Sequence, residues 1–254
     1  MDDTYLQDAT PETVLRWAIP RFGSSLALCT GFQAEGMVLI DMAARIDPSI
    51  RVLTVDTGRL PDETYRMIDT VHLRYGIRAE TVTPDSGEIE EMTRLHGSNL
   101  FLHDQSMRLL CCQIRKVRPL ERRLRDFSAW VVGLRRSQSD SRSALEKIER
   151  IDGRLKLSPL ADWSYGQVQA YIRDHRVPLH PLYTRGFTSI GCAPCTRATA
   201  PGEDERAGRW WWELDAAKEC GIHYAAHGRL RRHVDVLLED VLLRNDAVTV
   251  SSAK

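Results

Sequence analysis

Apolar residues in this chain fall into short runs separated by longer amphipathic stretches. Runs at residues 25–30, 51–56, 129–134 and 155–160 are rich in aliphatic residues, and a shorter one at 78–82 follows a glycine. Each is bounded by glycine, proline or a polar cluster, which is typical of buried strands. The pattern therefore predicts about five strands.

Apolar positions three and four residues apart predict helices between these strands. The predicted helices cover residues 11–22, 88–95, 106–125, 165–174 and 229–243, and two more begin after Gly31 and at Pro61. Thr10 is placed to cap the first helix, with Pro11 at its first position. Strands that alternate with helices predict an α/β fold, with a parallel sheet of about five strands and helices on both faces.

Small and polar residues stand where three of the predicted strands end. They are Thr30-Gly31, Asp56-Thr57-Gly58 and Gly133-Leu134-Arg135. In open parallel sheets, ligands bind beyond the carboxyl ends of the strands. We therefore expect these three segments to converge on one ligand.

Composition narrows the function classes. The 254 residues are 43% apolar and 28% charged, with 35 basic and 35 acidic residues, so no global field indicates nucleic acid or an anionic membrane as partner. No apolar run is long enough to span a bilayer, and residues 1–4 are acidic rather than part of an apolar signal. We expect a cytoplasmic protein, in which six cysteines are reduced, metal-bound or catalytic rather than disulfide-linked.

Two cysteine pairs indicate a metal centre. Cys192 and Cys195 have the spacing of a redox dithiol, half a zinc site or half an iron–sulfur site. Cys111 and Cys112 supply two more thiols, and adjacent cysteines suit a four-iron cube better than one tetrahedral zinc ion. A [4Fe–4S] cluster is the favoured interpretation, with zinc or no metal as alternatives. Cys29, in a predicted strand, is interpreted as a buried structural residue.

Basic residues gather near these cysteines. Lys116 follows Cys112 by one helical turn, so it should lie on nearly the same side of the helix. Arg206 and Arg209 share a face if their segment is helical, and planar guanidinium groups suit phosphate and sulfate oxygens. A third group follows a strand end and comprises Arg135, Arg136 and Arg142. No phosphate-binding loop of the ATP-cleaving types is present, which argues against ATP cleavage.

Cys220 stands apart from both pairs. Lys218 precedes it and His223 follows it, and nearby cations increase the thiolate fraction of a cysteine. Charged and glycine neighbours argue against a buried structural role, which is the alternative. We interpret Cys220 as a nucleophile that attacks an electrophilic centre of the ligand.

Several motifs coincide with one family. They are Asp56-Thr57-Gly58-Arg59-Leu60, Cys111-Cys112-Gln113-Ile114-Arg115-Lys116-Val117, Gly133-Leu134-Arg135-Arg136, Pro159-Leu160-Ala161-Asp162-Trp163, Ile190-Gly191-Cys192 and Lys218-Glu219-Cys220-Gly221-Ile222-His223. With them the chain resembles the assimilatory sulfonucleotide reductases, specifically the cluster-containing adenylyl-sulfate (APS) reductases. The resemblance covers most of residues 24–223 and implies a Rossmann-like fold of the adenine nucleotide alpha hydrolase type.

The resemblance also implies a mechanism. Cys111, Cys112, Cys192 and Cys195 would ligate a [4Fe–4S] cluster, and Cys220 would attack the sulfur of adenylyl sulfate, so that AMP leaves and an S-sulfonate forms. Thioredoxin, a separate protein, would then release sulfite. The implied substrate contacts are Thr30, Phe32, Val55, Lys116, Gly133, Arg142, Arg206, Arg209 and His223. Family members usually have a serine-rich first loop, whereas Phe32 has no hydroxyl and is left with a backbone contact.

Alternatives remain at this point. Relatives that act on phosphoadenylyl sulfate (PAPS) mostly lack the four cluster cysteines, so their presence favours APS, but some cluster-bearing members accept both. A tRNA sulfur-transfer enzyme would need an ATP-cleaving loop, and an iron–sulfur sensor would leave Cys220 idle. We expect residues 1–205 to form the nucleotide-binding part with the cluster, and residues 206–254 to form a mobile segment of the same domain that carries Cys220. Whether the protein forms a homo-oligomer is left open.

Overall fold

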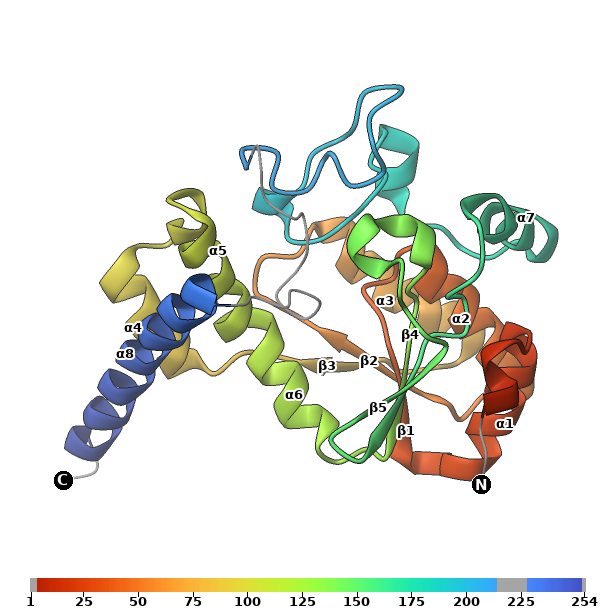
Figure 1. The fold of residues 1–254 in the computed structure, drawn as a ribbon, viewed down its shortest axis with the longest axis horizontal. Helices are drawn as coiled ribbons and strands as arrows, with labels where there is room; N and C mark the ends of the chain where they lie inside the picture. Colours follow the sequence, from red (N-terminus) through yellow and green to blue (C-terminus); the bar gives the residue numbers. More distant parts are fainter. Residues whose placement is uncertain (1–3, 214–227, 253–254) are drawn as a thin grey trace. The chain divides into compact units, whose positions relative to one another are not determined.

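The computed structural model describes residues 4–213 and 228–252 (Figure 1). The chain divides into two compact units. We call the first the sheet unit; it comprises Met1–Thr54, Arg59–Thr81 and Arg123–Arg209. The second, the helical unit, comprises Val55–Gly58, Val82–Arg122 and Trp210–Lys254. Each unit is described by itself.

The central element of the fold is a six-stranded sheet with the order β3-β2-β1-β4-β6-β5. Its strands are β1 (Leu26–Cys29), β2 (Arg51–Val55), β3 (Glu80–Val82), β4 (Ala129–Val132), β5 (Ile148–Ile151) and β6 (Arg154–Leu157). β1 pairs in parallel with β2 and β4, and β4 pairs in parallel with β6. The five predicted strands are all present, and the α/β class with a mostly parallel sheet is confirmed.

The sixth strand, β5, is antiparallel to β6 and corrects the expected strand number. The two strands are joined by Asp152 and Gly153, whose φ angles are 49° and 77°. Two-residue turns with positive φ match the twist of a hairpin, and Asp-Gly is one of the sequences that adopt them. This hairpin could have been predicted from the Asp-Gly pair, because it stands between two short stretches that contain apolar residues.

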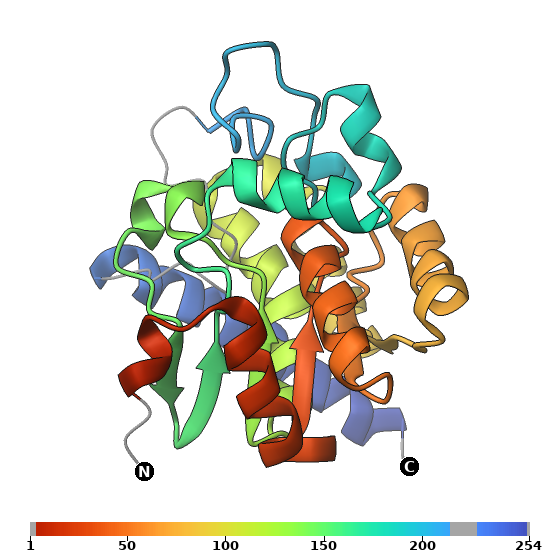
Figure 2. The same cartoon turned by 90° about the vertical axis from the view of Figure 1, so that its right-hand side faces the viewer.

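Helices flank the sheet (Figure 2). Those of the sheet unit are α1 (Pro11–Phe22), α2 (Ala34–Ile46), α3 (Asp62–Tyr75) and α7 (Tyr165–His175). The Thr10 hydroxyl accepts a hydrogen bond from the Thr13 backbone, so the predicted first cap is confirmed. α2 packs on α1, α7 and β1, and its residues from Ala34 to Ala43 are buried in the core together with Leu26, Leu28 and Val131.

The helical unit contains α4 (Ser86–His96), α5 (Gln105–Cys112), most of α6 (Arg118–Leu124) and α8 (Gly228–Ser252), which packs on α4 and α5. The helical stretch expected over residues 106–125, with a break or new start at Pro119, is α5 and α6 joined by a π-helical turn, Gln113–Val117. Within that turn the Arg118 amide donates to the Gln113 carbonyl, five residues back. Within residues 4–213 and 228–252, no helix has both the length and the apolar character needed to cross a membrane.

Candidate active site

The sheet reverses its strand order between β1 and β4. From β1 the chain continues to β2 on one side, and β4 lies on the other side, with Cys29 opposite Val132 in the parallel ladder. Thr30 and Gly133, two of the predicted contacts, therefore follow adjacent strands at the same edge of the sheet. Such switch points form the ligand crevice of open α/β sheets.

The loop after β1 is held by a local hydrogen bond. The Phe32 amide donates to the Thr30 hydroxyl oxygen over 2.8 Å, and Phe32 has a φ of 57°, which is uncommon for a residue with a side chain. The Phe32 ring is fully buried in the core. A ligand at this position would therefore meet the backbone, as the missing hydroxyl led us to expect.

Gly133 allows β4 to end close to α2. A β-carbon at Gly133 would stand 2.9 Å from the Glu35 β-carbon and 3.0 Å from the Gly36 amide nitrogen. Real side chains do not tolerate such distances, so packing against the first turn of α2 is enough to require glycine here. A role in substrate binding would be additional to this one.

Arg135, directly beyond β4, is the centre of a buried ion network. Its guanidinium donates to Glu35 over 2.7 Å and to Glu205 over 3.0 Å, and only 1% of its side chain is exposed. Burial raises the pKa of the Glu205 carboxyl, and the positive charge of Arg135 opposes that shift. The network fastens the loop that precedes Arg206 to the start of α2.

Arg142 belongs to the same polar cluster. The Gln138 side-chain oxygen accepts hydrogen bonds from the Arg135 amide and from the Arg142 guanidinium. Arg142 lies on a short 3-10 turn, η6 (Asp140–Arg142), and is buried. The third basic group predicted from the sequence is therefore an ordered part of the sheet unit, not a solvated loop.

Cys192 precedes a single 3-10 turn, η8 (Ala193–Cys195), and Cys195 is the last residue of that turn. The Thr196 hydroxyl donates to the Cys192 carbonyl over 2.9 Å, and the Ala193 amide donates to the Arg59 carbonyl over 2.8 Å. Cys195 is buried, whereas Cys192 is half-buried. These bonds fix the backbone that carries both thiols.

Arg209 lies beside this turn. Its guanidinium donates to the Ile190 carbonyl over 3.3 Å, and Thr196 and Arg209 form an antiparallel bridge. The segment with Arg206 and Arg209 is a set of turns that leads into this bridge, so the helical arrangement considered from the spacing does not form. Both arginines are nonetheless buried in the same unit as the cysteine turn.

The loop after β2 belongs to the helical unit. There the Asp56 carboxylate accepts a hydrogen bond from the Gly58 amide over 2.8 Å, and the Arg115 guanidinium donates to the Thr57 carbonyl over 2.9 Å. Val55, the predicted adenosine contact, ends β2 and is half-buried. Arg115 thus links this strand end to the turn that follows the adjacent cysteines.

Cys111 and Cys112 are the last two residues of α5. Cys111 is buried and Cys112 is half-buried. Lys116, also half-buried, lies within the π-helical turn that follows. The helical unit therefore contains one thiol pair and Lys116, and the sheet unit contains the other thiol pair with Arg142, Arg206 and Arg209.

Two predicted residues, Cys220 and His223, lie outside the described residues. Among those that are described, no three histidine, cysteine or acidic side chains are close enough to hold a metal ion. The two cysteine pairs belong to different units, so neither unit by itself contains a four-thiol site. Cys29, expected to be buried, is half-buried at the end of β1, and desolvation raises its pKa to about 12, which keeps that thiol protonated.

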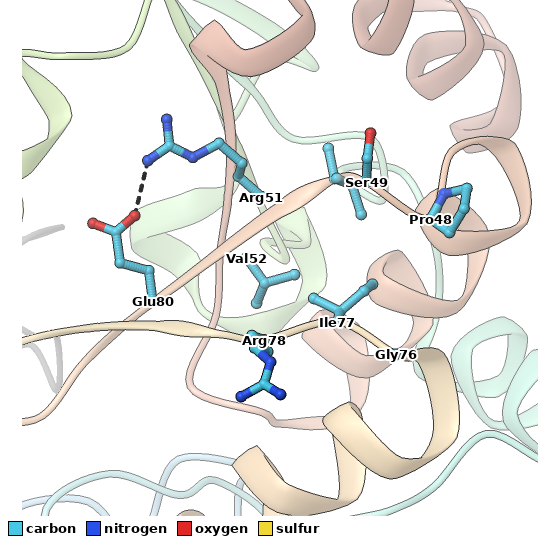
Figure 3. A pocket seen from close by; sticks show the side chains of 9 residues that line it. Pro48, Ser49, Arg51, Val52, Gly76, Ile77, Arg78 and Glu80 are labelled. Atoms are coloured by element: carbon cyan, nitrogen blue, oxygen red, sulfur yellow. Dashed lines mark hydrogen bonds and ion pairs between the residues drawn. The ribbon is translucent and has the colours of Figure 1, made fainter.

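The hollow of about 310 Å³ in Figure 3 is not this site. It is lined by residues around the starts of β2 and β3, among them Arg51, Arg78 and Glu80. Arg51 and Glu80 form an ion pair of 2.9 Å there. The starts of these strands lie opposite the carboxyl-end edge at which open α/β sheets generally bind ligands, and no predicted site residue lines the hollow.

The sheet order and the ligand edge at β1 and β4 are those of α/β proteins of the adenine nucleotide alpha hydrolase type. Solved structures agree: an FMN adenylyltransferase from Candida glabrata, 14% identical, aligns over 89% of this chain and 81% of its own with a TM-score of 0.53. At that identity the likeness concerns the fold alone. A phosphoadenylyl-sulfate reductase from Candida auris, 29% identical, aligns over 78% of this chain and 98% of its own with a TM-score of 0.65.

Sequence comparisons are more specific. The profile of the phosphoadenosine phosphosulfate reductase domain matches residues 25–198. Adenosine 5'-phosphosulfate reductase of Allochromatium vinosum is 47% identical over 201 residues, 78% of each chain. A chloroplastic 5'-adenylylsulfate reductase of Arabidopsis thaliana is 41% identical over 86% of this chain and 49% of its own. The chain belongs to the phosphoadenosine phosphosulfate reductase domain family, which confirms the resemblance seen in its motifs.

Proposed function

We propose that this protein reduces adenylyl sulfate to sulfite and AMP in assimilatory sulfate reduction. The observation that carries the proposal is the close similarity to bacterial proteins named adenosine 5'-phosphosulfate reductase, 47% and 46% identical over 78% and 80% of this chain. The geometry supports it, because a nucleotide-binding edge at Thr30 and Gly133 belongs to the same unit as buried arginines suited to a phosphosulfate.

The cations would bind the anionic end of the substrate. Arg142, Arg206 and Arg209 are 9%, 9% and 6% exposed, so their charges act where water screens them little. AMP becomes a good leaving group when the charge that develops on its phosphate is neutralised, and prearranged guanidinium groups serve this purpose. Lys116 and His223 complete the proposed contacts at the phosphosulfate.

Cys220 would carry the chemistry. Its thiolate attacks the sulfur of adenylyl sulfate, a sulfur–sulfur bond forms, and the bond from that sulfur to the bridging oxygen breaks, so that AMP leaves with the electron pair. A thioredoxin thiolate then attacks the Cys220 sulfur and expels sulfite. The second thioredoxin thiol displaces Cys220, and the thioredoxin disulfide that forms accounts for the two electrons.

Cys111, Cys112, Cys192 and Cys195 would hold a [4Fe–4S] cluster. The donor set fits, because such clusters take four thiolates and each pair here lies on an ordered turn or helix end. When bound, the cluster supplies negative charge that orders nearby cations, with no electron passed to the substrate. Lys116, four residues after Cys112, is the cation that we expect it to order.

Turnover on adenylyl sulfate and on phosphoadenylyl sulfate, measured with thioredoxin and its reductase, tests the proposal. We expect release of sulfite from adenylyl sulfate at a kcat/KM at least about tenfold higher, a difference of about 1.4 kcal/mol in transition-state binding. A preference for phosphoadenylyl sulfate would favour the alternative that the Candida auris structure illustrates. No turnover on either nucleotide would favour an iron–sulfur sensor. We also propose that the protein is cytoplasmic. Residues 1–205 would form the nucleotide-binding part with the cluster, and residues 206–254 the segment that carries Cys220.

A further inference from the structure

Arg108 and Glu213 form a buried ion pair in the helical unit. The Arg108 guanidinium donates to both carboxylate oxygens of Glu213, over 2.5 and 3.0 Å. The exposed fractions of the two side chains are 0% and 8%. A two-point bond of this kind fixes orientation as well as distance.

Two aromatic contacts hold the same short segment. The Arg108 guanidinium lies over the Trp210 ring, 4.4 Å from its centre, and the Trp212 ring lies 6.0 Å from that of Phe101. Trp210 is 1% exposed. Residues 210–213 are therefore fastened to α5 and to the turn before it through charge, cation–π and ring contacts.

This attachment has a particular place along the chain. Arg108 precedes Cys111 by three residues, so the segment is fastened to the helix that ends in the adjacent cysteines. Glu213 precedes Cys220 by seven residues, and seven extended residues span at most about 25 Å. On the other side of Cys220, α8 begins at Gly228 and packs on α4 and α5 of the same unit.

We propose that Arg108 is a positioning residue for the reaction, because its bonds to Glu213 and Trp210 fix the point from which the chain extends to Cys220. The inference rests on the proposed function, since it takes Cys220 as the nucleophile. Arg108 touches neither substrate nor the reacting sulfur in this account. It limits where the thiol can be, and small displacements of a nucleophile cost rate steeply.

The test measures the chemical step by itself. Cluster-loaded protein is mixed with adenylyl sulfate without thioredoxin, and the rate of Cys220 S-sulfonate formation is followed by mass. We expect Glu213→Gln and the double variant Arg108→Met with Glu213→Leu to form the adduct at least about tenfold more slowly. The rate at which iodoacetamide alkylates Cys220 should stay within about twofold, since it does not depend on placing the thiol at the substrate.

Controls separate positioning from folding. The double variant removes both buried charges, so it avoids the unpaired charge that a single replacement of either residue leaves. Arg244→Met breaks an exposed ion pair with Asp240 in the same unit and should leave the rate unchanged. If the folded variants form the adduct at the wild-type rate, the positioning role of Arg108 is wrong, while the proposed function still stands. Wild-type protein that forms no adduct would overturn that role together with the proposed function.

Discussion

Gly191 lies against the guanidinium of Arg209, where a β-carbon would stand 2.3 Å from Nη2 and 2.6 Å from Cζ. Gly191 also directly precedes Cys192, the first thiol of its pair. With Arg209 in this position, residue 191 must be glycine, because a β-carbon there would overlap the guanidinium. One close approach thus links the proposed sulfate-binding arginine to the cysteine turn.

Replacing Gly191 with alanine should displace the Arg209 side chain while leaving the backbone in place. The colliding atoms are the far end of a flexible side chain, so we expect a loss of stability below about 1 kcal/mol. The KM for adenylyl sulfate should rise about tenfold, the scale of one charge-assisted hydrogen bond. Steady-state kinetics and urea unfolding check this.

Gly166→Ala is the matched control, because a β-carbon there would meet only Ser164, at 3.8 Å. A Gly191→Ala enzyme with the KM of the wild type would show that the position of Arg209 does not matter to substrate binding. In an Arg209→Ala background, Gly191→Ala should add little, since the group that it displaces is already absent.

The Arg135 network should matter for stability. Arg135→Met leaves the buried carboxylate of Glu35 without its partner, which typically costs about 3–5 kcal/mol. Urea unfolding should show a correspondingly lower midpoint. Arg197→Ala, which breaks the exposed pair with Glu203, should change the midpoint little. Equal effects of the two replacements would contradict the role given to Arg135.

Local patterns predicted most of the fold but not the partners of its charged groups. Thr10 before Pro11 predicted the start of α1 because capping depends on neighbouring residues alone. The contacts of Arg135 with Glu35 and of Arg108 with Glu213 join residues 100 and 105 positions apart. No spacing rule predicts such pairs, so the sequence places Arg135 in a basic group without its partners and gives no role to Glu213.

For the candidate site, too, the sequence predicted only those features that depend on residues close together in the chain. The thiol spacing and the residues at strand ends could be read from the sequence, since both depend on short segments. The π-helical turn after Cys112 could not, because helical spacing alone predicts an unbroken α-helix up to the proline. The strand order that places Thr30 and Gly133 at adjacent strand ends is a property of the whole sheet.

His180 should make stability depend on pH. Burial lowers its pKa from 6.5 to about 4, and the Leu182 amide donates to its Nδ1 atom, which favours the neutral ring. The unfolded chain therefore binds the proton more readily than the folded one. Stability from this residue is present above pH 6.5 and is lost as the pH falls towards 4, by at most about 3 kcal/mol.

Urea unfolding at several pH values, with His180→Gln as the variant, measures this dependence. The wild type should lose stability between pH 6.5 and 4 more steeply than the variant. His103→Gln, at an exposed position, serves as the control and should follow the wild type. Parallel curves for all three proteins would show that His180 does not titrate differently in the folded state.

The iron content of the protein should depend on each of the four proposed cysteine ligands. Serine in place of Cys111, Cys112, Cys192 or Cys195 removes one thiolate, and we expect loss of iron, of acid-labile sulfide and of the brown colour. Cys29→Ser is the matched control and should keep all three, because Cys29 lies in β1 among core residues. A Cys192→Ser protein with full iron and sulfide would remove that residue from the ligand set.

Intact mass spectrometry of cluster-loaded protein incubated with adenylyl sulfate, in the absence of thioredoxin, tests the central claim most directly. The account predicts that the wild-type chain gains the mass of one SO₃ group and loses it when reduced thioredoxin is added. Cys220→Ser should gain nothing, whereas Cys29→Ser should behave like the wild type. A wild-type chain that stays unmodified, or a Cys220→Ser chain that is still sulfonated, would contradict the account.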